Sequence, residues 1–207
     1  MLPELNDKNA DIESVTGKAI TDEKLLSGLL DGLMSKVETY RYNCYKVLYA
    51  ISQTHPQILY PHWDYFAEAL GSANSYHKMA AVHLIANLTP IDKENRFEKI
   101  FDTYYSLLDD RSMVVAYYTA AASGRIVKAK PHLSKKITDK LLNIDRTHHE
   151  PGRKELIKTG VIEAFNEYFE DCDNKTEIID FVKQQLNSQS SKTRKTAKTF
   201  LFKWNKS

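Results

Sequence analysis

The stretch that decides the fold is Asp109-Asp110-Arg111-Ser112-Met113-Val114-Val115-Ala116, where a polar turn leads into a helical apolar pattern. Its central pair, Val114-Val115, has counterparts near the start of other helix-like segments: Tyr40-Arg41, Tyr76-His77, Gly152-Arg153 and Thr193-Arg194. Successive pairs are 36, 38, 38 and 41 residues apart. Such a period is typical of repeat proteins, whose units need neighbours to bury their apolar faces. The sequence therefore predicts an α-solenoid of about five helix pairs.

Apolar periodicity predicts two helices in each repeat. The expected ranges are 22–33 with 39–53, 58–70 with 75–88, 96–108 with 112–127, 133–142 with 152–168, and 177–186 with 192–203. Pro56, Pro90 and Pro131 follow the repeated position by 14 to 17 residues and end the second helix of the first three pairs. No Asn-Gly or Asp-Gly pair lies between alternating apolar runs, as a hairpin would require. The expected fold class is all-α, an α-α superhelix.

Two second helices carry specific packing expectations. The helix 75–88 is expected to face the core with Tyr76, Met79, Ala80, Val82, His83 and Ile85. In the helix 112–127, the small run Ala120-Ala121-Ala122-Ser123-Gly124 is expected to let neighbouring backbones approach closely.

Composition and charge describe an ordinary globular chain with uneven ends. Hydrophobic residues make up 42% and charged residues 27% of the 207 residues. Residues 1–21 show no sustained apolar period, so we expect a loose tail or a loosely docked helix, with ordered structure beginning at Asp22 and a single domain over 22–207. Residues 1–38 carry four Lys against eight Asp and Glu, whereas residues 188–207 carry six Lys and Arg and no acid. Such blocks would form local patches of charge.

The apolar stretches and the two cysteines indicate the cellular compartment in which the protein is expected. The longest apolar stretch, residues 113–122, is shorter than the ~20 residues of a membrane span, so no membrane partner is expected. The start of the chain lacks a secretory signal, and Cys44 and Cys172 lie in separate helical patterns. These features predict a cytoplasmic protein with unpaired thiols.

The repeated pattern resembles HEAT repeats, which are armadillo-type helix pairs of ~40–47 residues. The resemblance rests on the stretch 109–116 and on Lys192-Thr193-Arg194-Lys195-Thr196-Ala197, and it covers roughly residues 22–204. The chain departs from the family at His77 and Val115, where Arg is expected, and at Gly152, where an apolar residue is expected. The resemblance implies a scaffold that binds protein or nucleic acid along a concave surface formed by the second helices.

Catalytic and metal motifs are scarce. The sequence has no GxGxxG, P-loop, HExxH, CxxC or GxSxG motif, so we expect no enzyme, cofactor, metal or small-molecule substrate. The segment His148-His149-Glu150 is interpreted as a solvated turn, because adjacent helical residues point about 100° apart. One HEAT-like family, the alkylpurine DNA glycosylases, uses a Trp and Asp pair to steady a cationic base, and Trp63-Asp64 leaves that alternative open beside a purely structural Trp.

The candidate binding residues lie on the second helices. Arg41, Tyr45 and Tyr49 stand at i, i+4 and i+8, which predicts either a peptide-docking strip or aromatic core filling. Further candidates near the second-helix starts are His77, Lys78, Arg111, Arg153, Lys154, Arg194, Lys195 and Lys198. We expect a protein partner first and nucleic acid second.

Two structural alternatives remain for the basic candidates. Arg41, Arg153 and Arg194 would pair with turn aspartates of adjacent units, for which Asp109, Asp110, Asp145 and Asp173 are available. The lysines of the last helix would serve as the polar cap of a terminal repeat.

Overall fold

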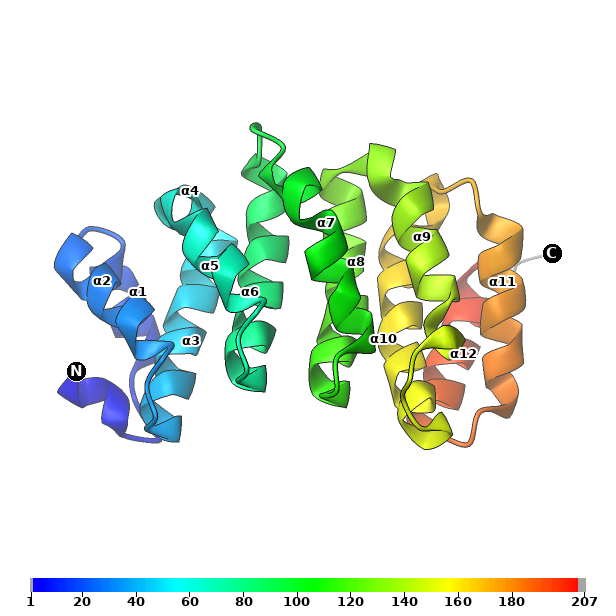
Figure 1. The fold of residues 1–207 in the computed structure, drawn as a ribbon, viewed down its shortest axis with the longest axis horizontal. Helices are drawn as coiled ribbons and strands as arrows, with labels where there is room; N and C mark the ends of the chain where they lie inside the picture. Colours follow the sequence, from blue (N-terminus) through cyan, green and yellow to red (C-terminus); the bar gives the residue numbers. More distant parts are fainter. Residues whose placement is uncertain (1, 205–207) are drawn as a thin grey trace. The chain divides into compact units, whose positions relative to one another are not determined.

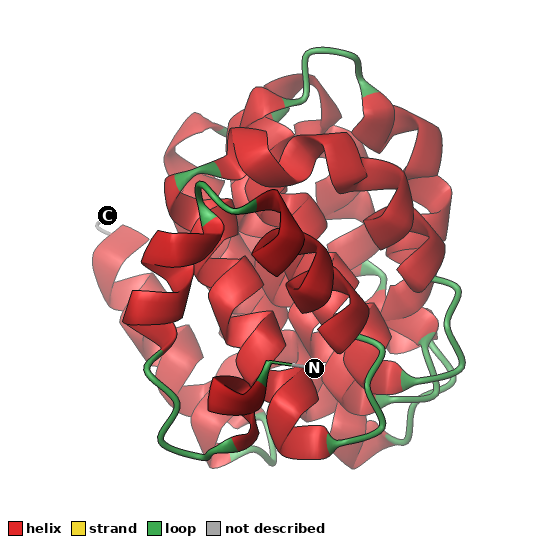
Figure 2. Ribbon diagram, turned by 90° about the vertical axis from the view of Figure 1, so that its left-hand side faces the viewer, coloured by secondary structure: helices red, strands yellow, loops and turns green. Residues whose placement is uncertain are grey.

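A computed structural model describes residues 2–204 of the chain. All regular structure in this range is helical, with no strand among these residues (Figure 2). The all-α prediction is confirmed. The chain forms two compact units, Met1–Glu94 and Asn95–Ser207, here called unit 1 and unit 2.

Unit 1 consists of two helical layers. Its α-helices are α1 (Ile12–Ala19), α2 (Glu23–Gly32), α3 (Glu38–Thr54), α4 (Pro56–Leu59), α5 (Trp63–Ala69) and α6 (Ser75–Leu88), with short 3₁₀ helices at Pro3–Asn6, Tyr60–His62 and Thr89–Ile91. Helices α3 and α6 pack together in one layer, and α1, α2, α4 and α5 form the other (Figure 1). In α3, Cys44, Val47, Leu48 and Ile51 recur at helical spacing and are fully buried.

The amino-terminal segment departs from the expected loose tail. Helix α1 begins after Asp11, whose Oδ1 accepts a hydrogen bond from the Ser14 amide at 3.0 Å. Leu5 is fully buried, and Asn43 Nδ2 donates to the carbonyl oxygens of Leu5 and Asp7 at 3.0 and 2.7 Å. The expectation that ordered structure begins at Asp22 is therefore wrong, because an interior asparagine of α3 binds the backbone of this segment. The single domain over 22–207 stays a prediction.

The expected helix 58–70 is also interrupted. Pro56 starts α4 directly after α3, and Pro61 lies in the 3₁₀ turn Tyr60–His62 that separates α4 from α5. Because proline lacks an N–H group, Pro61 cannot continue the α-helical hydrogen bonding. The first helix of the second repeat is consequently two short helices.

Unit 2 repeats the two-layer arrangement. Its helices are α7 (Arg96–Ser106), α8 (Met113–Ala129), α9 (Ser134–Leu142), α10 (Pro151–Tyr168), α11 (Lys175–Gln184) and α12 (Ser191–Trp204), with short 3₁₀ helices at Leu107–Asp109, Pro131–Leu133, Ile144–Arg146, Phe169–Asp171 and Gln185–Asn187. Helices α8, α10 and α12 form one layer, and α7, α9 and α11 the other (Figure 1). Every helix predicted in this unit is present within a few residues of its expected ends.

Helices α8 and α10 lie unusually close together. A Cβ atom added to Gly160 of α10 would lie 2.7 Å from the Tyr117 carbonyl oxygen of α8, and one added to Gly124 would lie 2.8 Å from Glu167 Cβ. Side chains at these positions would push the helices apart. The close approach predicted from the small run on α8 is confirmed, although Gly160 was not anticipated.

The repeated position occupies a constant place in the fold. Tyr40, Tyr76, Val114, Gly152 and Thr193 are each the second or third residue of α3, α6, α8, α10 and α12. Cys44 and Cys172 are buried free thiols, which confirms the prediction of unpaired thiols. The helical pattern expected around Cys172 is wrong, because this residue lies between the 3₁₀ turn Phe169–Asp171 and α11.

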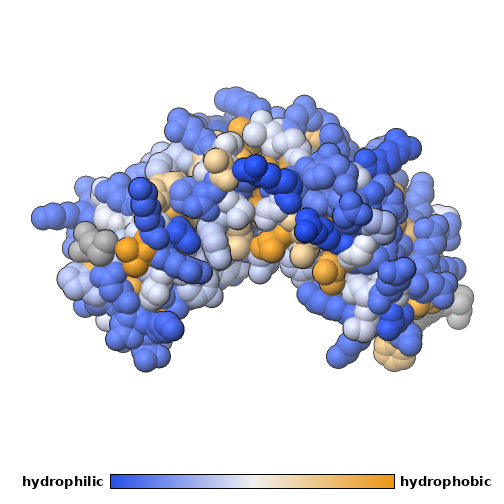
Figure 3. All heavy atoms as spheres, turned by 60° about the horizontal axis from the view of Figure 1, so that its bottom comes forward, coloured by the Kyte–Doolittle hydropathy of each residue, from blue (hydrophilic) through white to orange (hydrophobic). Residues whose placement is uncertain are grey.

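Surface apolarity is limited on the face drawn in Figure 3, where hydrophobic residues form small areas between hydrophilic ones. Within residues 2–204, no helix is both long enough and apolar enough to span a bilayer.

Candidate partner-binding surface

The exposed side of α3 and α6 in unit 1 carries a continuous set of aromatic rings, here called the tyrosine surface: Tyr42, Tyr45, Tyr49, Tyr76 and His83. Spacings of three and four residues place the three α3 tyrosines on one helix face, with ring centroids 6.3 Å apart for Tyr42 and Tyr45 and 5.7 Å apart for Tyr45 and Tyr49. His83 of α6 stacks on Tyr45 with centroids 5.9 Å apart, and its Nδ1 shares a hydrogen bond with Tyr45 Oη. The rings thus join two helices into one rigid aromatic area.

Two cations lie over the outer rings of this surface. The Arg41 guanidinium is 4.6 Å from the Tyr76 ring centroid, and Lys46 Nζ is 5.1 Å from that of Tyr42. Tyr42 and Tyr76 keep 52% and 46% of their area exposed. The sequence-based placement of Tyr76 in the core is wrong, because its ring instead lies against Arg41 of the preceding second helix. Cation and ring contacts of this kind remain available to solvent and to a ligand.

A pocket of about 450 Å³ opens beside these rings. It is lined by Lys8, Glu38, Thr39, Arg41, Tyr42, Asn43, Lys46 and Tyr76. Three cations therefore face one carboxylate, and Tyr76 Oη donates to Glu38 Oε1 at 3.4 Å. The net positive charge of this lining favours an anionic group.

His77 lies at the start of α6 but contributes little to this surface. Its Nδ1 shares a hydrogen bond of 3.1 Å with Ser72 Oγ, and its buried Nε2 has no hydrogen-bond partner among the described residues. Burial, aided by the nearby Arg41 charge, lowers the pKa of His77 below its usual value. A neutral, partly enclosed imidazole is a structural group here. The neighbouring candidate Lys78 is half-buried.

Unit 2 presents tyrosines on the matching helices, but their polar groups are bound within the unit. Tyr117 Oη of α8 donates to Glu163 Oε2 of α10 at 2.7 Å and accepts from Lys192 Nζ of α12 at 3.0 Å. Trp204 Nε1 donates to Asn166 Oδ1 at 2.9 Å. This network ties the three second helices together and uses groups that a partner would otherwise bind.

Two of the three arginines at the repeated position, Arg41 and Arg194, close the loops in front of their own helices. Arg41 Nη1 donates to the Ser35 carbonyl at 2.8 Å, and Arg194 Nη1 donates to the Ser188 carbonyl at 2.6 Å. Each acceptor lies six residues before its arginine. The predicted pairing of these two arginines with turn aspartates is therefore wrong.

The turn aspartates of unit 2 bind other residues. Asp145 Oδ1 lies 2.9 Å from Lys158 Nζ, and Asp109 Oδ1 accepts from both the backbone amide and Nδ1 of His148 at 2.7 and 2.6 Å. The candidate Lys154 donates to the Asp145 carbonyl at 2.9 Å. The exposed candidates in this unit are Arg111, Arg153, Lys195 and Lys198.

The residues considered for catalysis and metal binding lie in packed surroundings. Trp63 is 1% exposed, so its indole cannot stack on a nucleobase while the core is intact. The interpretation of His148-His149-Glu150 as a solvated turn is wrong for His149, which is buried with Nε2 3.2 Å from the Leu108 carbonyl oxygen. Within residues 2–204, no three His, Cys, Asp or Glu side chains are arranged to hold a metal ion.

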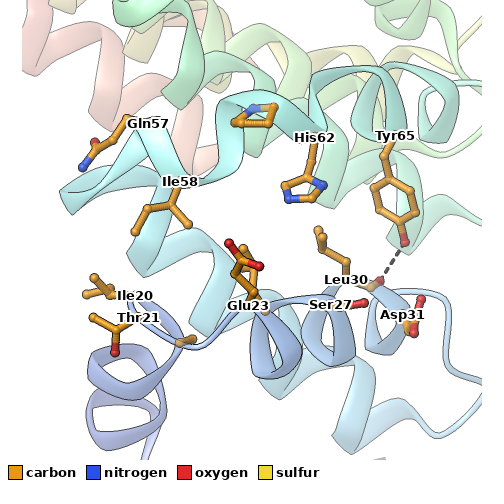
Figure 4. Close-up of a pocket in the computed structure, with 13 residues that line it drawn as sticks. Ile20, Thr21, Glu23, Ser27, Leu30, Asp31, Gln57, Ile58, His62 and Tyr65 are labelled. Carbon is orange, nitrogen blue, oxygen red and sulfur yellow. Dashed lines mark hydrogen bonds between the residues drawn. The ribbon is translucent and has the colours of Figure 1, made fainter.

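A second concavity of unit 1 lies on its other layer, between α2 and α4–α5, and is here called the acidic groove (Figure 4). Its cavity volume is about 770 Å³. The apolar lining residues are Ala19, Ile20, Leu26, Leu30, Ile58 and Pro61. Ile58 and His62 point toward α2, Glu23 points back across the groove, and Tyr65 Oη donates to the Leu30 carbonyl at 2.7 Å (Figure 4). Sequence reasoning missed this site, because the nearest lining residues of its two walls, Asp31 and Gln57, are 26 positions apart in the chain.

Only part of the predicted site is brought together. Arg41, Tyr45 and Tyr49 share one surface, whereas the candidates of unit 2 are divided between loop closure and isolated exposed positions. Lys8 and Lys46 were missed, although the i, i+4 spacing of Tyr42 and Lys46 was a readable signal. No protein-family model matches the chain, and no curated protein matches it significantly.

Proposed function

We propose that this chain is a HEAT-type α-solenoid that acts as a non-enzymatic scaffold and binds a protein segment on the tyrosine surface. Two features support the HEAT-type assignment: the repeated position at each second-helix start, and the shared loop closure by Arg41 and Arg194. Regularly stacked helix pairs commonly serve as binding scaffolds.

The observation that carries the binding proposal is the pair of half-exposed rings, Tyr42 and Tyr76, each covered by a cation beside a 450 Å³ pocket. Tyrosine offers rigid apolar area at a low cost in conformational entropy, and tyrosine and arginine are enriched among residues that dominate binding energy. The partner segment is therefore expected to combine an acidic side chain, placed near Lys8 and Lys46, with an apolar group that covers the rings.

Affinity capture from a native extract on the immobilised full chain tests this proposal. The double variant Tyr42→Ala/Tyr76→Ala is expected to lose the proteins that the unmodified chain retains. The matched control Val114→Ala/Phe202→Ala removes two exposed apolar side chains of unit 2 and is expected to retain them. Cross-linking the retained protein should map its contact to α3 and α6. Equal retention by the tyrosine variant and the unmodified chain would overturn the proposal.

Nucleic acid is the second candidate, favoured by the exposed Lys195 and Lys198 on α12, which form no ion pair with a described residue. Binding through phosphates weakens by about one power of salt concentration for each phosphate neutralised. Titration of labelled single-stranded and duplex DNA and RNA between low and physiological salt, with Lys195→Glu/Lys198→Glu as the variant, measures this slope. Flat salt dependence or an unaffected variant would exclude this candidate.

A further inference from the structure

The acidic groove carries charge of one sign. Its two charged acidic lining residues are Glu23 and Asp31, both exposed on α2, and no Lys or Arg among the described residues lines it. Neither carboxylate forms an ion pair with a described residue. The groove thus combines an apolar floor with an uncompensated acidic rim.

The corresponding cavity of unit 2, between α7 and α9, is different. Its volume is about 680 Å³, and its lining includes Lys136, Lys140 and Arg146 together with Asp109 and Asp139. Several of these charges are compensated inside the unit, since Lys136 Nζ lies 3.8 Å from Asp102 Oδ1 and Asp139 Oδ2 lies 2.8 Å from Lys135 Nζ. An uncompensated rim is therefore a property of unit 1 and does not follow from the repeat architecture.

The residues by which α2 lines the groove recur with the period of an α-helix. Glu23, Ser27 and Asp31 stand at i, i+4 and i+8 along one face, so the carboxylates are about 12 Å apart along the axis. Leu26 and Leu30 form an adjacent apolar stripe, and each is 7% exposed. Ile58 points into the groove from the opposite wall, on the side of Ile20 and Thr21 (Figure 4).

We propose that the acidic groove binds a short amphipathic helix of a partner protein. Apolar side chains of that helix enter between α2 and α4, while two Lys or Arg residues, about eight positions apart, face Glu23 and Asp31. A helical partner has the same axial rise as α2, so its cations match the spacing of the two carboxylates. Acidic segments and phosphates are repelled by this rim. The site is separate from the tyrosine surface and does not rest on its proposed function.

A designed peptide supplies the probe. It has about three to four helical turns, leucines at i, i+3 and i+7 spacing, and two lysines eight residues apart; a second peptide replaces the lysines with glutamates. Fluorescence anisotropy with the full chain is expected to show at least tenfold tighter binding of the lysine peptide. Hydrogen exchange should show peptide-dependent protection in α2 and α4.

Charge reversal then tests the site. Glu23→Lys/Asp31→Lys is expected to weaken binding of the lysine peptide at least tenfold and to improve binding of the glutamate peptide. Glu13→Lys/Glu68→Lys changes net charge equally at exposed positions outside the groove and should bind as the unmodified chain does. Circular dichroism verifies that both variants fold. If the first variant proves unfolded, Glu23→Gln/Asp31→Asn replaces it, with loss of the preference for the lysine peptide expected.

Three results would overturn the proposal. The first is equal binding of the two peptides to the unmodified chain, and the second is protection outside α2 and α4. The third is self-association, measured by analytical ultracentrifugation and abolished by the groove variant, which would assign the groove to a second copy of the chain.

Discussion

The two units use the same helix-pair arrangement, but they differ in how completely their surface groups are bound within the unit. In unit 1, Tyr42 and Tyr76 are half-exposed, and the carboxylates of the acidic groove form no ion pair with any residue of the described range 2–204. In unit 2, Tyr117 lies in a network with Glu163 and Lys192. Architecture alone therefore does not decide which polar groups stay unbound at the surface; the residues supplied by neighbouring helices do.

The two units differ because their helices approach each other to different degrees and carry different residues at the contacts. Gly160 lets α10 approach α8 closely, and Glu163, one turn further along, then reaches Tyr117. In unit 1 the ring of Tyr76 meets a cation, Arg41, and Tyr76 Oη makes only a 3.4 Å contact with Glu38. Binding capacity is consequently expected to be local to unit 1.

Among the changes that test this comparison, the largest expected loss of stability comes from forcing α8 and α10 apart. Gly160→Ala places a Cβ atom 2.7 Å from the Tyr117 carbonyl oxygen, and overpacking of this kind costs about 1–3 kcal/mol. Urea unfolding followed by circular dichroism should show this loss in the free energy of unfolding. Gly17→Ala in α1 is the control, because nothing lies within 4 Å of its added Cβ, and it should be neutral or stabilise by up to about 1 kcal/mol. Equal stability of Gly160→Ala and the unmodified chain would contradict the close packing.

A smaller effect is expected from removing single hydroxyl groups. Tyr117→Phe removes the hydrogen bonds to Glu163 and Lys192 and should lower the free energy of unfolding by about 1 kcal/mol. The same change at Tyr42, whose hydroxyl makes no hydrogen bond to a described residue, should stay within about 0.5 kcal/mol. Equal costs in urea unfolding would show that the two surfaces do not differ as described.

The smallest change in stability is expected when the pH is lowered, and both units should show this change. Burial is the main cause that lowers the pKa values of His77 and His149 below the unfolded value of 6.5. The folded state then binds fewer protons than the unfolded state between the two pKa values. Stability from this source is complete above about pH 6.5 and is lost as the pH falls through 6.5 toward the folded pKa.

Urea midpoints at about pH 7.5 and 5.5 measure this dependence. We expect His77→Gln and His149→Gln each to reduce the decline in stability, through unit 1 and unit 2 respectively. If both variants lose as much stability between these pH values as the unmodified chain does, other groups cause the loss.

Local sequence signals predicted most of the helices but not their contacts. Helix α6 has both ends as predicted, because Asn74 caps its start and Pro90 follows its end. The break at Pro61 was missed, since the apolar stripe on both sides suggested one continuous helix. Tyr76 was placed in the core because its exposure depends on α3, a neighbour that periodicity within α6 cannot specify.

The candidate site was predictable only where it lies on one helix. The i, i+4, i+8 spacing located Arg41, Tyr45 and Tyr49, whereas the pocket also needs Lys8 from the amino-terminal segment. The acidic groove joins two segments distant in the chain, so no local pattern specifies it.

The loop closures by Arg41 and Arg194 have a consequence for how such repeats diverge. Both arginines bind main-chain oxygens, which every amino acid possesses. The side chains of Lys36 and Gln189 can therefore change without loss of this hydrogen bond. Ser35 and Ser188 are more constrained, because their Oγ atoms accept from the Val37 and Ser190 amides, each at 3.1 Å. A loop can thus keep its geometry with few fixed letters, so recognisable spacing outlasts recognisable sequence.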